Sequence, residues 1–347
     1  MKKRLFYLDF IRAIATIAIL LTHYNALYIY MFKQDMLNRV VITGSVANIY
    51  IGDFGVSLFF IISGASLMYV YDEKLELGKF YKKRIKSIFP MFYLAYISAF
   101  LFNFYRFKNI VPPAPKRNFL LTIFGMDGLF SSVVPTWYIL GEWFLGFIIL
   151  VYLIFPLLRF CVKKQPVITA IVVAILYVLT VVLYKGKMAP STIITMRIPE
   201  ILFGMLFVKF GKKVKWPVAL GALAVLIVNS ILKPQIHSSI QTTYIGIASF
   251  LLLVFISYGL EKVVAVNAAS MVISKYSYAI FLVHHFIIYY VAGQFDLGSI
   301  SVVKSYLLFV VCMVIIAFFA RILYDGNRYI TGKLGMLFKI NRNATLE

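Results

Sequence analysis

Residues 9–23 read DFIRAIATIAILLTH, an apolar run with an acid and a base near one end and an imidazole at the other. Arg12 and His23 are eleven residues apart, so on an α-helix they lie within roughly 20° of one another and about 16 Å apart along the axis. Ionisable groups inside a membrane are costly and usually face a bundle interior or a water-filled cavity. One such group can simply be a polar contact between packed helices. Arg12 and His23 on one face, with Asp9 beside them, favour a functional site.

The whole chain has the composition of a polytopic membrane protein. Of its 347 residues, 62% are hydrophobic and 14% are charged, whereas soluble domains have roughly 45–50% apolar and about 25% charged residues. The mean hydropathy is +0.89. Long apolar runs exclude a transmembrane β-barrel, which would show short alternating segments. The expected fold is an all-α polytopic membrane protein, a bundle of about ten transmembrane helices.

Ten apolar windows approach the ~20 residues that a helix needs to cross the bilayer. They are 7–30, 54–71, 87–105, 137–160, 166–184, 193–210, 216–232, 243–260, 276–293 and 302–324. The sixth is interrupted by Arg197 and Glu200, and the seventh is short. The first resembles a signal peptide, but it lacks a small-residue cleavage site and carries Asp9 and Arg12, so we expect it to be retained as a helix.

The distribution of Lys and Arg orients the bundle. With the N-terminus inside, the inner segments hold 23 of the 35 Lys and Arg residues and the outer loops hold 10. This bias predicts that both termini are cytoplasmic in a cell-membrane protein. It also accounts for the formal net charge of +22, which in a soluble protein would suggest nucleic acid. We expect one membrane domain over residues 1–347, no soluble esterase-like domain, and a short basic cytoplasmic tail at 325–347.

Polar side chains in three other windows fall at depths that match His23. Glu142 lies one to two turns into the fourth window, Arg197 lies in the outer half of the sixth, and His284 and His285 lie near the middle of the ninth. Adjacent helical residues point about 100° apart, so only one of the two histidines readily faces a given pocket. A histidine is the side chain best suited to act as a general base near neutral pH. A nearby carboxylate can orient it.

The inner face carries a different chemistry. Residues 79–86, just before the third window, contain four lysines and Arg84. Such a patch can bind phosphates, or it can serve orientation and attraction to anionic lipid. Of these residues, Arg84 beside Arg12 is the pairing that we assign to phosphates. Two cysteines, Cys161 and Cys312, match no metal or redox spacing, and no metal site is expected.

Five motifs in order resemble the membrane acyltransferase 3 family. They are Leu8-Asp9 followed by Arg12 and His23, then Gly55-Val-Ser-Leu-Phe-Phe-Ile-Ile-Ser63-Gly64, then Phe80-Tyr-Lys-Lys83-Arg84-Ile-Lys-Ser87-Ile88-Phe-Pro90, then Trp137 through Glu142, and finally Ser277-Tyr278-Ala-Ile-Phe-Leu-Val-His284. The similarity extends from about residue 7 to residue 320.

The resemblance implies transfer of an acyl group, usually acetyl from cytoplasmic acetyl-CoA, to a hydroxyl of a cell-surface or lipid-linked polysaccharide. It implies that His23 is catalytic and that Arg12, Lys83 and Arg84 lie near the coenzyme's phosphates. Lys83 stands where the family has an arginine, which keeps the charge but loses the bidentate fork. Ser87 replaces the third arginine of the motif.

Roles for the remaining polar residues follow as hypotheses. Glu142 or Asp9 orients His23, Arg197 or Tyr278 binds the oxyanion or the acceptor, and His284 supports the site. His23 acts either as a general base or as a transient carrier of the acetyl group. A separate extracytoplasmic protein is a possible partner that completes the transfer.

Two other classes of function also fit about ten helices. A flippase for lipid-linked saccharide would need a large polar cavity and no acyl donor. A membrane glycan polymerase would be expected to have a large extracytoplasmic loop, whereas the loop at about 106–136 is modest.

Overall fold

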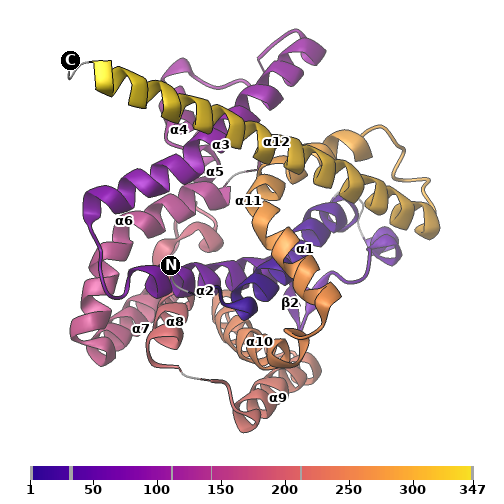
Figure 1. The fold of residues 1–347 in the computed structure, drawn as a ribbon. Coiled ribbons are helices and arrows are strands. Elements are labelled where there is room, and N and C mark those ends of the chain that lie inside the picture. Colours follow the sequence, from indigo (N-terminus) through magenta and orange to yellow (C-terminus); the bar gives the residue numbers. More distant parts are fainter. Residues whose placement is uncertain (1–2, 31–33, 111, 142, 212, 345–347) are drawn as a thin grey trace.

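The computed structural model describes residues 3–30, 34–110, 112–141, 143–211 and 213–344. Ten helices of 17 residues or more make up most of it (Figure 1). They are α1 (Phe6–Ile29), α2 (Ile51–Tyr71), α3 (Leu77–Phe107), α6 (Trp143–Lys164), α7 (Pro166–Leu183), α8 (Ile194–Phe210), α9 (Trp216–Leu232), α10 (Ser238–Leu260), α11 (Val264–Ala292) and α12 (Val302–Ala344).

The expected all-α polytopic architecture is confirmed. Within the described residues, eight of these helices are long and apolar enough to cross a membrane. The other two, α8 and α9, have 17 residues each and occupy the sixth and seventh windows. Hydrocarbon offers no partner for a backbone N–H or C=O group, so an apolar spanning segment forms a helix, in which these groups pair with one another.

Helix α7 shows which surface faces lipid. Only 11% of its most apolar 18-residue window is buried, and its exposed side chains include Ile168, Ile175, Leu179 and Leu183. An apolar surface of this extent would be unstable in water, and it fits contact with acyl chains.

Two helices, α3 and α12, are longer than the apolar windows that predicted them. Helix α3 begins at Leu77, so the basic residues at 79–86 lie on its first turns. The expectation that they precede the helix was wrong, because Lys and Arg are good helix formers and their long stems carry the charged heads to water. Helix α12 continues past Tyr324 through the expected basic tail to Ala344.

Helix α1 lies among α2, α10 and α11, near the middle of the bundle (Figure 1). Helices α2 and α8 approach so closely that a Cβ atom on Gly64 would lie 2.0 Å from the carbonyl oxygen of Ile201. A Cβ atom on Gly204 would lie 2.0 Å from the carbonyl oxygen of Ile61. Small residues allow such backbone contact between membrane helices, and here Gly64 and Gly204 allow α8 to pack directly against α2.

Several helix ends meet where α3 begins with its basic residues 79–86, and we call this the basic end of the bundle. The hydroxyl of Tyr69 donates to the carbonyl oxygen of Lys3. Lys209 forms an ion pair with Asp72 at 2.9 Å, and Arg159 donates to the carbonyl oxygens of Tyr71 and Asp72. The beginning of α1 therefore lies at the same end as the ends of α2, α6 and α8.

The connection between α3 and α6 contains only short elements. They are η2 (Lys116–Asn118), α4 (Phe119–Ile123) and α5 (Asp127–Phe130). The indole N–H of Trp137 donates to the carbonyl oxygen of Ala114 at 3.2 Å, which ties the two ends of the connection together. Asp127 is fully buried, and burial raises the pKa of its carboxyl to about 6.

The remaining short elements lie in two other connections. The connection from α1 to α2 holds η1 (Gln34–Arg39) and a hairpin of β1 (Ser45–Val46) and β2 (Ile49–Tyr50). The hairpin is antiparallel, with Ser45 opposite Tyr50. One further 3-10 turn, η3 (Pro190–Thr192), precedes α8.

Candidate functional site

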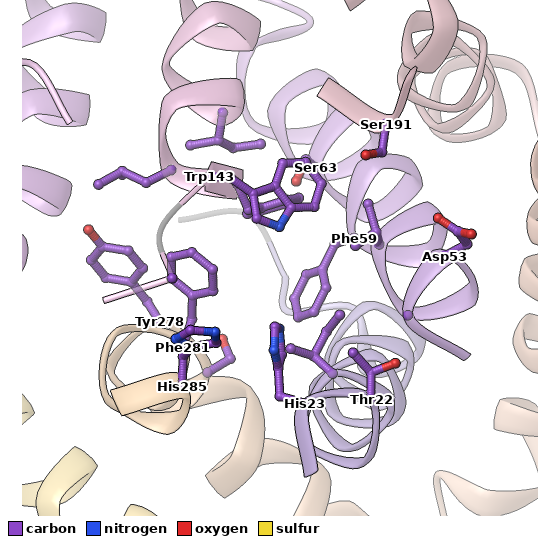
Figure 2. Close-up of a pocket in the computed structure, with 18 of the residues that line it drawn as sticks. Thr22, His23, Asp53, Phe59, Ser63, Trp143, Ser191, Tyr278, Phe281 and His285 are labelled. Atoms are coloured by element: carbon purple, nitrogen blue, oxygen red, sulfur yellow. The ribbon is translucent and has the colours of Figure 1, made fainter. Parts of the chain in front are cut away.

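A cavity of about 650 Å³ lies between α1, α2, α6 and α11. Figure 2 shows side chains from several helices converging on it. Helix α1 contributes one face, including Arg12, Ile19, His23, Ala26 and Tyr30. From Ile19 onward they recur every three or four residues, and Arg12 lies two turns before Ile19, so all of them lie on one face of the helix. The cavity therefore follows α1 from its basic end towards its other end.

Three imidazoles meet at one wall of this cavity. The ring centroid of His23 lies 4.7 Å from that of His284 and 5.0 Å from that of His285, both edge to face. His23 and His285 line the cavity, while His284 lies behind them and is buried. Among the described residues, no group of three or more His, Cys, Asp or Glu side chains is arranged to hold a metal ion.

The backbone of α11 selects the tautomer of a neutral His284. Its Nδ1 atom lies 2.8 Å from the carbonyl oxygen of Phe281 and 3.2 Å from that of Ile280. Carbonyl oxygens only accept hydrogen bonds, so Nδ1 carries the proton, and Nε2 of the neutral ring keeps its lone pair. This Nε2 atom is buried and has no hydrogen-bond partner among the described residues. His284 thus offers an acceptor to a neighbouring N–H.

His285 is held by a close backbone approach. Gly141 has a φ of +75°, and a Cβ atom there would lie 2.5 Å from Cγ of His285. Only glycine fits a position with this torsion angle and this contact. Glu142, the next residue and the predicted carboxylate partner of His23, lies outside the described residues.

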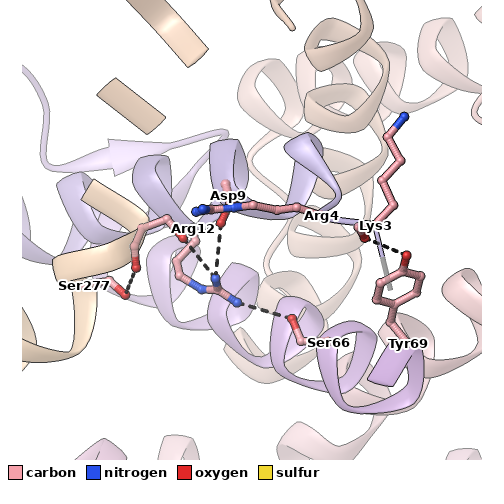
Figure 3. A network of polar contacts seen from close by, with 8 residues as sticks. Lys3, Arg4, Asp9, Arg12, Ser66, Tyr69 and Ser277 are labelled. Atoms are coloured by element: carbon pink, nitrogen blue, oxygen red, sulfur yellow. Dashed lines mark hydrogen bonds and ion pairs between the residues drawn. The ribbon is translucent and has the colours of Figure 1, made fainter. Parts of the chain in front are cut away.

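Arg12 is fixed at the basic end of the cavity (Figure 3). Its guanidinium donates to the hydroxyls of Ser274 at 3.0 Å and Ser66 at 3.3 Å, and it lies 3.6 Å from the carboxylate of Asp9. Asp9 also pairs with Arg4 and accepts from the Ser274 hydroxyl at 2.6 Å. The guanidinium is therefore oriented by three helices.

Asp9 does not orient His23. It precedes His23 by fourteen residues on one continuous helix, which separates them by about 21 Å along the axis. Its carboxylate is used by Arg4, Arg12 and Ser274. The structure therefore makes Asp9 a partner of Arg12, and the alternative that placed it beside the imidazole was wrong.

Arg84 lies behind an aromatic wall. Its guanidinium donates to the hydroxyl of Tyr71 at 3.0 Å, and its carbon lies 5.5, 5.7 and 5.4 Å from the ring centroids of Tyr71, Phe80 and Tyr152. Of these residues, Tyr152 lines the cavity. Lys83 is exposed and is not part of the cavity lining. The two adjacent cations therefore occupy different environments.

Arg197 lies behind the cavity wall rather than in it. Its Nε atom is 3.2 Å from a carboxylate oxygen of Glu200, and both side chains are buried. Glu200 also accepts from the hydroxyl of Ser57, and the guanidinium lies over the ring of Phe60. In this arrangement Arg197 does not contact a bound molecule directly. The charged residue of α2 that does line the cavity is Asp53.

Tyr278 lines the cavity on the same side as Phe281 and His285 (Figure 2). Its hydroxyl donates to the carbonyl oxygen of Ile88 at 3.1 Å. A phenol has one O–H proton, so the expected oxyanion contact is excluded while this bond is kept. Tyr278 instead joins α11 to α3.

Sequence reasoning missed several residues of this cavity, and Asp53, His285 and Tyr152 are three of them. Asp53 stands one residue before the second apolar window, where a charged side chain is ordinary. His285 was passed over for His284, although the 100° step between neighbours left either possible. Tyr152 is one of 24 tyrosines, and nothing in the sequence distinguishes it.

The comparisons with known proteins identify one family. A family model described as "Acyltransferase domain" matches residues 5–324. No curated protein and no solved structure matches the chain.

Proposed function

The chain belongs to the acyltransferase 3 family, and we propose that it moves an acetyl group from cytoplasmic acetyl-CoA to a hydroxyl of a cell-surface or lipid-linked polysaccharide. One observation carries the proposal. A single cavity contains a fixed guanidinium, Arg12, at one end and an imidazole, His23, further along. The two are separated by about 16 Å along α1. An extended pantetheine arm is of that length or longer.

The basic end of the cavity supports binding of the donor. Arg12 is held by Asp9, Ser66 and Ser274, and its Nη groups are suited to a phosphate oxygen. Arg84 lies behind Tyr152, and rotation of that ring would bring Arg84 to the coenzyme. Lys83 is exposed, so we assign it to attraction of the anionic coenzyme rather than to a directed contact.

The reaction centre is His23. The acceptor oxygen attacks the thioester carbonyl carbon while His23 takes the hydroxyl proton. The C–S bond then breaks, and the leaving thiolate takes the proton from His23. His284 has the acceptor atom that a neutral His23 needs, because an N–H of His23 bonded to His284 Nε2 leaves the other ring nitrogen free to act as the base.

A second route uses the same residues. His23 attacks the thioester itself, carries the acetyl group, and passes it to the acceptor hydroxyl. Rapid quenching of the reaction with labelled acetyl-CoA distinguishes the two routes, because only the second leaves label on the protein.

The proposal places the protein in the cell membrane with both termini in the cytoplasm. The inner position of most Lys and Arg residues supports this orientation. Donor then reaches Arg12 from the cytoplasm, and acceptor reaches His23 from the other side. A separate extracytoplasmic protein as the final carrier fits the same scheme.

Incubation of membranes with labelled acetyl-CoA tests the activity. The proposal predicts label in the glycan as an alkali-labile ester, and only when the protein is present. Movement of unmodified lipid-linked saccharide across the membrane, without label in the glycan, would instead identify a flippase. Lengthening of the glycan without label would identify a polymerase.

A further inference from the structure

The part of the cavity beyond His23 carries a carboxylate that the donor does not explain. Asp53 lies in the first turn of α2 and lines the cavity together with Thr22 and Ser191. Figure 2 shows Asp53 and Ser191 on the side of the cavity away from Tyr278. Thr22 directly precedes His23, so this wall continues from the reacting imidazole.

Asp53 has a buried cation, Arg197, on the neighbouring helix, but that cation already has a carboxylate partner. Arg197, the cation on the neighbouring α8, is paired with the buried Glu200. Because Glu200 occupies that cation, an ionised Asp53 keeps its negative charge towards the cavity. Of these three charged residues, Asp53 is the one that lines the cavity. An ionisable residue in a membrane bundle that faces a cavity indicates a functional site.

The negative charge of Asp53 does not suit the donor, which is also an anion. Coenzyme A is an anion, and the fixed cation that suits it, Arg12, lines the same cavity at the beginning of α1. An ionised carboxylate only accepts hydrogen bonds, so its natural ligand is a neutral molecule with several hydroxyl groups. Two aromatic rings complete the mouth. Tyr30 and Tyr50 both line the cavity and stand edge to face with centroids 6.2 Å apart.

We propose that Asp53, with Ser191 and the rings of Tyr30 and Tyr50, forms the subsite for the acceptor sugar, and that the unit acetylated is a neutral sugar. The carboxylate accepts from two hydroxyl groups of that unit, and the tyrosine rings cover its C–H faces. A uronic acid or a sugar phosphate is repelled by Asp53. This inference rests on the proposed transfer reaction and specifies its acceptor.

The test uses glycan extracted from cells that lack the gene, so that its hydroxyl groups are unmodified. The full-length protein in proteoliposomes receives labelled acetyl-CoA and a titrated amount of this glycan. Asp53→Asn raises the half-saturating glycan concentration by about tenfold or more, because a hydrogen bond to a charged group is lost. The KM for acetyl-CoA stays unchanged. Asp53→Glu keeps the charge and recovers part of the glycan affinity.

A matched control separates this effect from loss of any carboxylate. Asp325→Asn removes an exposed carboxylate of α12, 3.7 Å from Arg321, and leaves both half-saturating concentrations unchanged. Mass spectrometry of released oligosaccharides then locates the acetyl group, and a neutral sugar is expected.

Three results overturn the inference. The first is an unchanged glycan dependence in Asp53→Asn, the second is an equal loss of affinity for acetyl-CoA and glycan, and the third is an acetyl group on an acidic sugar. A wild-type protein that transfers no label refutes the proposed function itself, and the assignment of Asp53 falls with it.

Discussion

The ring of His284 stands edge to face against that of His23, with centroids 4.7 Å apart, and its Nδ1 atom is bonded to carbonyl oxygens of its own helix. The tautomer of His284 is therefore set by α11 rather than by the cavity. We propose that His284 positions His23, a role that a carboxylate fills in catalytic triads.

Replacement of His284 tests this role. His284→Ala removes the Nε2 acceptor, so kcat is expected to fall by about 10²-fold, while the KM for acetyl-CoA changes little. His284→Gln keeps an acceptor oxygen and recovers part of kcat. His237→Gln, at the start of α10 and away from the cavity, serves as the control. An effect of His284→Ala on KM alone would show that His284 shapes the donor site instead.

Arg84 and Lys83 form a natural pair for comparison, because they are adjacent but differ in environment. Arg84→Ala is expected to raise the KM for acetyl-CoA by about tenfold, since a partly buried phosphate contact is lost. Lys83→Ala, which removes an exposed cation, changes it by less than about threefold. The measurement is the acetyl-CoA dependence of transfer at two salt concentrations. Equal effects of the two variants would contradict the assignment.

Gly141 is expected to tolerate no side chain. Gly141→Ala places a Cβ atom 2.5 Å from His285 at a φ of +75°, and the left-handed conformation alone costs about 1–2 kcal/mol. Activity should fall at least about tenfold as His285 is displaced. Gly221→Ala in α9, where a Cβ atom meets nothing within 4 Å, should leave activity intact. An active Gly141→Ala protein would show that the histidine cluster adapts to this displacement.

Burial of Asp127 gives stability a pH dependence. Its pKa is raised from 3.8 to about 6, so the folded protein holds the proton more tightly than the unfolded chain, and stability falls as pH rises from about 4 to 6. Asp127→Asn removes this cost and should stabilise the protein at pH 7.5 by up to about 3 kcal/mol. The gain should shrink by about half at pH 5. Thermal inactivation in detergent at the two pH values measures it, and a gain that does not depend on pH would refute the account.

The sequence predicted the helices well because their signal is local. Each long apolar run must form a helix in a membrane, and α8 and α9, the two windows that looked weakest, are also the two shortest of the ten long helices. The spacing of Arg12 and His23 placed both residues on one wall because one uninterrupted helix carries them.

The partners of these residues depend on packing between helices and were harder to predict. The ring of His284 lies against that of His23 only because α11 packs on α1 at that depth. Arg197 looked like a ligand contact, but α8 packs so tightly on α2, through Gly64 and Gly204, that its side chain is enclosed with Glu200. No rule of spacing within one helix contains that information.

The central claim is that His23 activates the acceptor hydroxyl, and the most direct test is transfer of labelled acetyl from acetyl-CoA by His23→Ala in proteoliposomes supplied with unmodified glycan. The account predicts that the variant inserts and keeps its thermal stability but transfers no label, with a fall in rate of at least about 10²-fold. Transfer at the wild-type rate by a correctly folded His23→Ala protein would contradict it.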